Sequence, residues 1–336
     1  MTFSVPVLYY HRIGAPDPIH LSIPTAEFEA QMNFLSRRGF ETITMARLIA
    51  HISGKTKIAR RSVAITFDDG FRDNYGNAFP ILKKLGLKAA IFPATALIRP
   101  DDHPGRDVSG AFNEAHTRAR RGDLGDFLSF SEITKMVSSG VCEFHSHSHS
   151  HNQVFVGNEI RGIYPDTDNH WGILSAYGDC LENADWPIFA RGPGLINKAW
   201  CPNLQAIKKE FSRGNTDRVK MSMSCFSIED DERFITRIRK ELTISRDLLK
   251  PFHSEGCDVI CWPWGASDSC LVAEAKRAGY HGALKTCTGS NSPGSDPYAV
   301  FRFPIKKKGL FRFALGIFLR SNPALAKIYG SFWGRI

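Results

Sequence analysis

Residues 64–70 read Ala-Ile-Thr-Phe-Asp-Asp-Gly, an apolar run that leads directly into two carboxylates and a glycine. The apolar part is typical of a buried strand. Asp and Gly also favour an ordinary polar turn after a strand, so this pair alone does not establish a site. Side chains that neighbour each other at a strand end point in different directions. Asp68 and Asp69 can therefore take different roles, one binding a metal and the other handling a proton.

A second polar cluster follows another apolar run, at residues 141–151, which read VCEFHSHSHSH. In an α/β barrel, functional groups gather at the carboxyl ends of the strands. Two histidines, one carboxylate and open positions for water form the usual hydrolytic metal site. His147 and His151 have the i, i+4 spacing that suits two imidazoles on one face of a helical turn. His145 and His149 share that spacing, so spacing alone does not choose between the pairs.

Short apolar runs alternate with stretches of helical periodicity along most of the chain. This alternation predicts an α/β fold with a parallel sheet, either open or closed into a barrel. We expect strands at 5–10, 63–67, 89–92, 141–144 and 258–261, and helices at 25–38, 75–85, 131–139, 234–249 and 267–278.

Two segments interrupt the alternation. Residues 99–127 are rich in Asp, Arg, Gly and His and are expected to form a long surface loop. Residues 157–231 contain Trp171, Trp186 and Trp200 with little periodicity, and long insertions of this kind are usually functional loops. These tryptophans would form either a sugar-stacking lid or a small separate core.

Charge is distributed unevenly along the 336 residues, which carry a formal net charge of +9. No acidic residue follows Asp296, whereas eight basic residues lie from Arg302 onward, so residues 1–301 are nearly neutral. General nucleic-acid binding is not expected from this pattern. The N-terminus lacks the features of a signal peptide, no apolar run approaches ~20 residues, and the cysteines are scattered; we therefore expect a cytoplasmic protein.

The two polar motifs resemble those of the polysaccharide deacetylases, carbohydrate esterase family four. The segment 5–13, VPVLYYHRI, resembles the N-terminal strand of the circularly permuted subgroup, which includes the poly-N-acetylglucosamine deacetylases. The segment 260–265, ICWPWG, resembles the family's Pro-Tyr-Gly motif. Further pieces of the resemblance are Asp73-Asn74-Tyr75, Ala89-Ala90-Ile91-Phe92, Gly279-Tyr280 and Arg302-Phe303-Pro304-Ile305.

This resemblance implies a distorted (β/α) barrel of the polysaccharide deacetylase type with seven strands and a long insertion. The catalytic domain would span 1–305, with insertions at about 99–127 and 157–231, and a basic aromatic segment would follow at 306–336. The family's second motif, aligned with residues 143–151, places its metal ligands on His147 and His151. Asp69 would be the third ligand of a divalent metal, in the first instance Zn²⁺, with Co²⁺, Ni²⁺ or Mn²⁺ as alternatives.

The same resemblance assigns the catalytic roles. Asp68 would be the general base, His11 the acid that protonates the leaving amine, and the backbone N–H of Trp264 a donor to the oxyanion. Trp264 replaces the tyrosine of the family motif, and Cys261 is unusual beside the pocket. Arg302 and Arg191 are candidates for the arginine that tunes the base. Cys257 and Cys261 are a weaker candidate for joining a metal site.

These residues predict a metal-dependent hydrolase that removes an N-acetyl group from an amino sugar of a surface glycan or its lipid-linked precursor. Two alternatives are a non-catalytic glycan- or lipid-binding protein on the same fold and a hydrolase of a non-sugar amide. In 306–336, bases interleave with aromatic residues, a pattern that suits peripheral contact with an anionic membrane. The alternative for that segment is a closing helix docked on the barrel.

Overall fold

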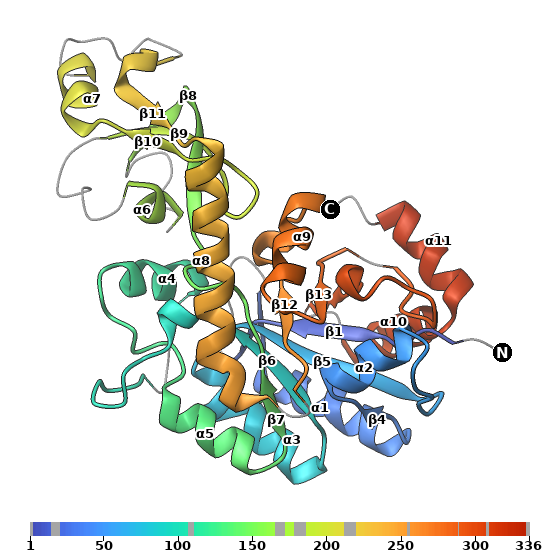
Figure 1. The fold of residues 1–336 in the computed structure, drawn as a ribbon. Helices are drawn as coiled ribbons and strands as arrows, with labels where there is room; N and C mark the ends of the chain where they lie inside the picture. Colours follow the sequence, from blue (N-terminus) through green and yellow to red (C-terminus); the bar gives the residue numbers. More distant parts are fainter. Residues whose placement is uncertain are drawn as a thin grey trace.

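A computed structural model describes residues 3–14, 21–106, 111–164, 172–177, 186–211, 220–253, 256–287, 289–306 and 309–333. Within these ranges, parallel strands alternate with helices, as the sequence predicts (Figure 1). The predicted basic residues Lys307, Lys308 and Arg335 lie outside the described residues, as does Trp171.

A parallel sheet of five strands in the order β14-β1-β5-β6-β7 forms the centre of the fold. Its longest strand, β5, is buried along its whole length, which explains its apolar sequence. The strands are β1 (Val7–Tyr10), β5 (Ser62–Asp69), β6 (Ala89–Pro93), β7 (Cys142–Phe144) and β14 (Phe303–Pro304), and β4 (Glu41–Thr42) pairs with the start of β5.

Two further parallel strands, β12 (Val259–Cys261) and β13 (Gly282–Leu284), complete a ring. A parallel bridge between Ser146 and Ile260 joins the end of β7 to β12. A second bridge, between Leu284 and Val300, joins β13 to the segment that leads into β14. Among the described residues, seven parallel strands therefore close into a distorted barrel, and the predicted fold class is confirmed.

Helices cover the outside of the barrel with the apolar faces that the sequence predicts. In α1 (Thr25–Arg37), for example, Phe28, Met32 and Leu35 are buried against the sheet. The other covering helices are α3 (Phe79–Leu85), which continues a π-helical turn at Asn74–Ala78, α5 (Phe130–Ser138), α8 (Asp231–Leu249) and α9 (Ser269–Arg277).

The barrel interior is filled by small and apolar side chains from its strands, including Val7, Ala64, Phe92 and Val259. Helix α2 (Met45–Ile52) packs on this interior cluster, and its first N–H donates to Glu143 Oε1 at 2.6 Å. Because α2 and Glu143 close the amino-terminal end, the carboxyl end of the barrel is left for polar groups.

The expectation of a long surface loop at 99–127 is wrong in part. This segment contains α4 (Phe112–Arg120), which buries Phe112, Ala115 and His116. Its buried side packs on Phe71 and Phe127 at the carboxyl end of the barrel. Nine residues with a polar outer face are too short a stretch for periodicity to reveal a helix.

The segment 157–231 contains regular structure that its sequence did not indicate. An antiparallel hairpin, a second short strand pair and two helices enclose a core of their own, and Figure 1 shows them beyond the barrel at one end of α8. Trp186 is buried in this core, which supports the small-core alternative for that residue. The elements are β8 (Gln153–Tyr164), α6 (Gly172–Tyr177), β9 (Trp186–Pro193), β10 (Trp200–Pro202), α7 (Leu204–Phe211) and β11 (Phe226–Ile228).

The C-terminal segment forms two helices, α10 (Gly309–Ser321) and α11 (Pro323–Trp333). One face of α10 packs on α1, where the rings of Phe34 and Phe313 lie 6.0 Å apart between centroids. This face of α10 therefore agrees with the alternative that the C-terminal segment forms a closing helix docked on the barrel. In the described part of the chain, we find no helix with the length and apolar character needed to span a bilayer. Two short strands, β2 (Arg12–Ile13) and β3 (Ser22–Ile23), complete the description.

Candidate metal centre and active site

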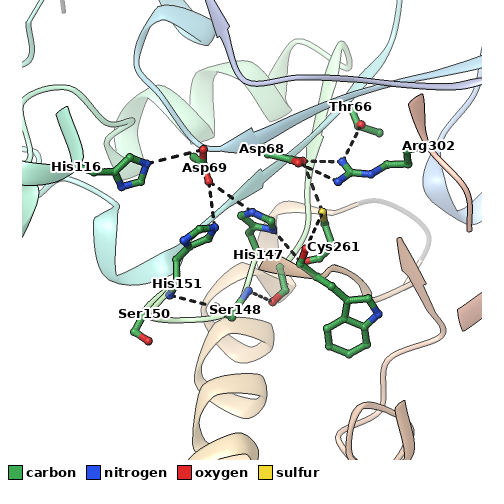
Figure 2. A network of polar contacts seen from close by, with 12 residues as sticks. Thr66, Asp68, Asp69, His116, His147, Ser148, Ser150, His151, Cys261 and Arg302 are labelled. Atoms are coloured by element: carbon green, nitrogen blue, oxygen red, sulfur yellow. Dashed lines mark hydrogen bonds and ion pairs between the residues drawn. The ribbon is translucent and has the colours of Figure 1, made fainter. Parts of the chain in front are cut away.

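The carboxyl end of β5 brings the two adjacent carboxylates to different neighbours (Figure 2). Asp69 Oδ1 lies 3.5 Å from Nε2 of His147 and 3.5 Å from Nε2 of His151. Asp68 faces the other way, toward Arg302 and Cys261. The prediction that neighbouring acids serve different partners agrees with this geometry.

Backbone conformation at this end of the barrel is unusual. Among the described residues, the non-glycine residues with positive φ are Asp69 (67°), Ser148 (62°), His151 (51°) and Trp264 (62°). All four belong to the segments that carry the predicted site residues. A non-glycine residue in this region costs about 1–3 kcal/mol and persists where the surrounding structure enforces it, which is common at functional sites.

The histidine segment is an irregular turn, so the expected helical turn is wrong. Its serines explain the alternation with histidine. Ser146 Oγ accepts the N–H of Ser148 at 3.1 Å, and Ser148 Oγ accepts the N–H of His151 at 3.2 Å. These short side-chain bonds hold the turn that aims His147 and His151 at Asp69.

The other two histidines point elsewhere. The ring of His145 stacks on His253 with a centroid separation of 5.4 Å, and its Nε2 lies 3.4 Å from Glu143. His149 Nδ1 lies 2.8 Å from Thr95 Oγ1. The three-dimensional arrangement thus brings together the pair that the family resemblance indicated, a choice that spacing left open.

The orientation of His147 is fixed by its second nitrogen. Nδ1 donates to the backbone carbonyl of Cys261 at 2.8 Å, which leaves Nε2 facing the carboxylates. Burial lowers the pKa of His147, but the effects of Cys261, Asp69 and Asp68 outweigh burial. The pKa of His147 is therefore well above its ordinary value. A carbonyl partner on the far nitrogen is the usual support of a metal-binding imidazole.

The residues around Asp69 fit a divalent metal. One donor atom each from Asp69, His147 and His151 lies within 4.8 Å of the other two, and all three residues are buried. Asp69 Oδ2 is buried and accepts no hydrogen bond from the described residues. Burial raises the pKa of Asp69, but His116, His147 and His151 outweigh it and lower the pKa well below its usual value. An ionised carboxylate with two imidazoles is a donor set typical of hydrolytic zinc sites.

Asp68, His147 and Cys261 also lie close enough together to hold a metal, but Asp68 has another partner. Arg302 donates two hydrogen bonds to its carboxylate, at 2.7 Å and 2.9 Å. Burial raises the pKa of Asp68, yet the charges of Arg302 and His147 outweigh it and lower the pKa. Cys257 and Cys261 both belong to the barrel-interior cluster, and it is Cys261 whose Sγ lies 3.6 Å from Asp68 Oδ1.

Of the two arginine candidates, Arg302 reaches the predicted base and Arg191 does not. Arg302 is buried and pairs with Asp68, and its guanidinium also donates to Thr66 Oγ1 at 3.3 Å. Arg191 donates to Gln153 at 3.1 Å, within the inserted segment. The candidate role for Arg191 is therefore wrong.

His11 follows β1 directly, beside the strand that carries the two acids. Tyr10 of β1 is paired with Phe67 of β5, so His11 and Asp68 emerge at the same strand ends. The backbone carbonyl of His11 accepts a hydrogen bond from buried Asn74 at 2.9 Å. The charge of His11 contributes to lowering the pKa of both Asp68 and Asp69, consistent with a place at the mouth of the site.

Trp264 follows β12, in a 3₁₀ turn at Pro263–Gly265. The residue is 37% exposed, and its ring centroid lies 5.0 Å from that of His151. Gly265 is required next to it, because a Cβ there would lie 1.9 Å from Thr286 Oγ1 at a φ of +67°. This turn therefore fixes the backbone of Trp264 against the histidine segment.

Sequence reasoning missed three supporting residues. His116 of α4 has its Nε2 3.9 Å from Asp69 Oδ2. Arg120, one turn later, donates to the carbonyl of Ser150 at 2.7 Å. Glu241 of α8 accepts the N–H groups of His149 and Ser150 at 3.0 Å and 2.8 Å. No motif marks these residues, because they reach the site from elements far apart in sequence.

Comparisons with known proteins agree with this architecture. Residues 55–176 match the family model described as polysaccharide deacetylase. This segment of the chain is therefore similar to the polysaccharide deacetylases. The matched segment includes both acids of β5 and the histidine segment, so the resemblance noted in the sequence is confirmed.

Curated proteins that are similar to this chain carry related names. The chain is 42% identical over 89 residues to the Bacillus subtilis protein YxkH, which is named for the same family; this covers 26% of the chain and 31% of YxkH. It is 25% identical over 231 residues to a poly-beta-1,6-N-acetyl-D-glucosamine N-deacetylase of Staphylococcus epidermidis, covering 65% of the chain and 68% of the relative. The chain thus spans only part of the length of these relatives.

Solved structures share the fold. The deacetylase domain of BpsB from Bordetella bronchiseptica has a TM-score of 0.60 at 19% identity, covering 90% of this chain and 96% of its own. IcaB from Ammonifex degensii has a TM-score of 0.56 at 17% identity, covering 91% and 93%.

Proposed function

We propose that this protein is a metal-dependent hydrolase that removes the N-acetyl group from an amino sugar. The observation that carries the proposal is the convergence of Asp69, His147 and His151, with Asp68 beside them in a charged pair with Arg302. Both acids and both histidines lie within residues 55–176, the segment that matches the polysaccharide deacetylase family model.

The bound divalent metal, in the first instance Zn²⁺ and alternatively Co²⁺, Ni²⁺ or Mn²⁺, would supply Lewis-acid activation of a water and of the acetyl carbonyl. Asp68 acts as general base and accepts a proton from the attacking water, and Arg302 keeps its carboxylate ionised and oriented. The backbone N–H of Trp264 stabilises the oxyanion of the tetrahedral species. His11 protonates the amine as the C–N bond breaks, giving acetate and the free amino sugar.

The names of the relatives favour a saccharide substrate. The Staphylococcus epidermidis relative is named for deacetylation of a β-1,6-linked N-acetylglucosamine polymer. For this chain we propose a surface glycan or its lipid-linked precursor. Cytoplasmic localisation with peripheral membrane contact through 306–336 remains part of this proposal.

A matched pair of substitutions on α8 tests how the ligand-bearing turn is held. Glu241→Ala removes the acceptor of two N–H groups in that turn, so we expect metal affinity to fall about 10- to 100-fold, as for other residues that support metal ligands. Metal affinity is measured by competition with a chromophoric chelator. Glu232→Ala, an exposed position on the same helix, serves as control and should leave the affinity unchanged. Equal affinities for the two variants would show that α8 does not position the ligands.

Acetate release from a substrate panel separates the proposed function from its alternatives. The panel contains N-acetylglucosamine oligomers, O-acetylated saccharides and simple acetamides. We expect release from the N-acetylated oligomers at the highest kcat/KM. Equal or greater turnover of the simple acetamides would favour a non-sugar amide hydrolase. Oligomer binding without acetate release would favour a non-catalytic glycan-binding protein.

A further inference from the structure

A large apolar cleft lies far from the metal centre, between α1 and the C-terminal helices. Its volume is about 900 Å³, within the range of pockets that hold small ligands. Its apolar lining includes Phe3, Phe34, Phe40, Ile317 and Phe318.

Three arginines, Arg38, Arg60 and Arg61, line the same cleft. All three are exposed, and none forms an ion pair with a carboxylate in the described part of the chain. Arg61 donates to the backbone carbonyl of Arg38 at 3.0 Å, which keeps these two residues together. The cleft thus combines an apolar wall with uncompensated positive charge.

The outer face of α10 continues this apolar surface. Phe311, Leu315 and Phe318 follow one another at i, i+4 and i+7, and are 80%, 44% and 65% exposed. The apolar residues that α10 buries, Phe313 and Ile317, lie on its other side. On α11, Ile328 is 55% exposed. Helix α10 is thus apolar on both faces, and the described residues cover only one of these faces.

The charge of this surface indicates what covers it. Exposed Arg312 and Lys327 add to the three cleft arginines, and no acidic residue follows Asp296 in the chain. Aromatic and aliphatic side chains beside unpaired bases are typical of a surface that enters the headgroup region of an anionic bilayer.

We propose that the cleft and the outer face of α10 together bind an anionic phospholipid bilayer. Phe311, Leu315 and Phe318 enter the acyl boundary, and Arg38, Arg60 and Arg61 contact lipid phosphates. This surface joins residues of the N-terminal part of the chain to the C-terminal segment, so it is larger than the tail alone.

The position of this surface has a consequence for the substrate. Phe3 precedes β1, and Arg60 and Arg61 precede β5, so the cleft lies at the amino ends of the barrel strands. Asp68 and Asp69 lie at the other end of β5, about 25 Å away for eight residues of strand. A bilayer at the cleft therefore leaves the mouth of the site facing away from it, toward a glycan that extends from the membrane. The statement that the site faces a glycan rests on the proposed function.

Vesicle flotation tests the lipid surface without reference to activity. The probes are phosphatidylcholine vesicles with and without phosphatidylglycerol, at low and high salt. We expect binding only to the phosphatidylglycerol vesicles, and weaker binding at high salt. The triple variant Arg38→Gln, Arg60→Gln, Arg61→Gln should bind about 100-fold more weakly, roughly fivefold for each base. Phe311→Ser with Phe318→Ser should also lose binding.

A matched control removes three exposed bases elsewhere, in the variant Lys135→Gln, Arg233→Gln, Lys240→Gln, and should bind like the parent. Equal binding of both triple variants, or no binding to either vesicle, would overturn the proposal. So would a dimer in sedimentation that becomes a monomer in the Phe311→Ser, Phe318→Ser variant, because the face would then be covered by a second copy.

The orientation is tested separately with a soluble N-acetylglucosamine oligomer. Vesicle-bound protein should release acetate at the same rate as free protein, because the site faces away from the bilayer. A strong loss of rate on binding would contradict the orientation while leaving the lipid surface intact. Absence of acetate release in both states would instead count against the proposed function.

Discussion

Replacing Asp68 with asparagine is expected to lower kcat for acetate release by about 10²- to 10⁴-fold, the usual contribution of general base catalysis. The amide keeps the shape of the side chain but cannot accept the proton of the attacking water. Metal content should remain that of the parent protein, because Asp69 and the two histidines are unchanged. Steady-state kinetics and metal analysis of the same preparation check both statements.

Stability must be measured together with activity in this variant. Arg302 is fully buried, and Asp68 is its charged partner, so Asp68→Asn leaves a buried charge uncompensated. Loss of one partner of a buried pair typically costs about 3–5 kcal/mol in the free energy of unfolding. The double variant Asp68→Asn, Arg302→Met removes both charges and should recover much of that stability without recovering activity.

The control for this series is Asp102→Asn, an exposed acid in the segment before α4. It should match the parent protein in rate and stability. Turnover of Asp68→Asn at the parent rate would show that another group is the base. Recovery of activity in the more stable double variant would show that the loss came from unfolding.

Replacing His147 with alanine is expected to remove both the metal and the activity. His147 supplies one of three converging donors, and its orientation is fixed by the carbonyl of Cys261. Loss of a residue that only supports a ligand costs about 10- to 100-fold in metal affinity, so loss of the ligand itself should cost at least the upper value. Metal content after dialysis and acetate release are the two measurements.

His149→Ala is the matched control, since it lies two residues away in the same turn and contacts Thr95. It should retain metal and most of the activity. A protein that loses metal in His149→Ala and keeps it in His147→Ala would show that the other histidine pair holds the ion.

Much of the barrel could be predicted from the sequence, because its strands are buried on both faces. The run before Asp68 is apolar for this reason, and the helices between the strands show apolar stripes such as Phe28, Met32 and Leu35. The family motifs also singled out His147 and His151, the two histidines that the structure brings beside Asp69. Spacing alone could not do this, since the turn is irregular and its geometry depends on serine side chains.

The parts that sequence reasoning missed depend on contacts between distant segments. His116 lies on a nine-residue helix whose outer face is polar, so the segment resembled a loop. Glu241 is one of several acidic and basic residues on α8, and its role appears only when its partners in the histidine turn are known. The inserted hairpin of β8 and β9 has register shifts, which weaken the alternation that would mark its strands.

The most direct test of the account is acetate release from N-acetylglucosamine oligomers by a single preparation in three states. The states are the protein as purified, the protein after chelation and dialysis, and the dialysed protein after addition of Zn²⁺. We predict release in the first state, loss in the second and recovery in the third, with no recovery in His147→Ala. Release that persists unchanged in metal-free protein would contradict the proposal that Asp69, His147 and His151 hold the catalytic metal.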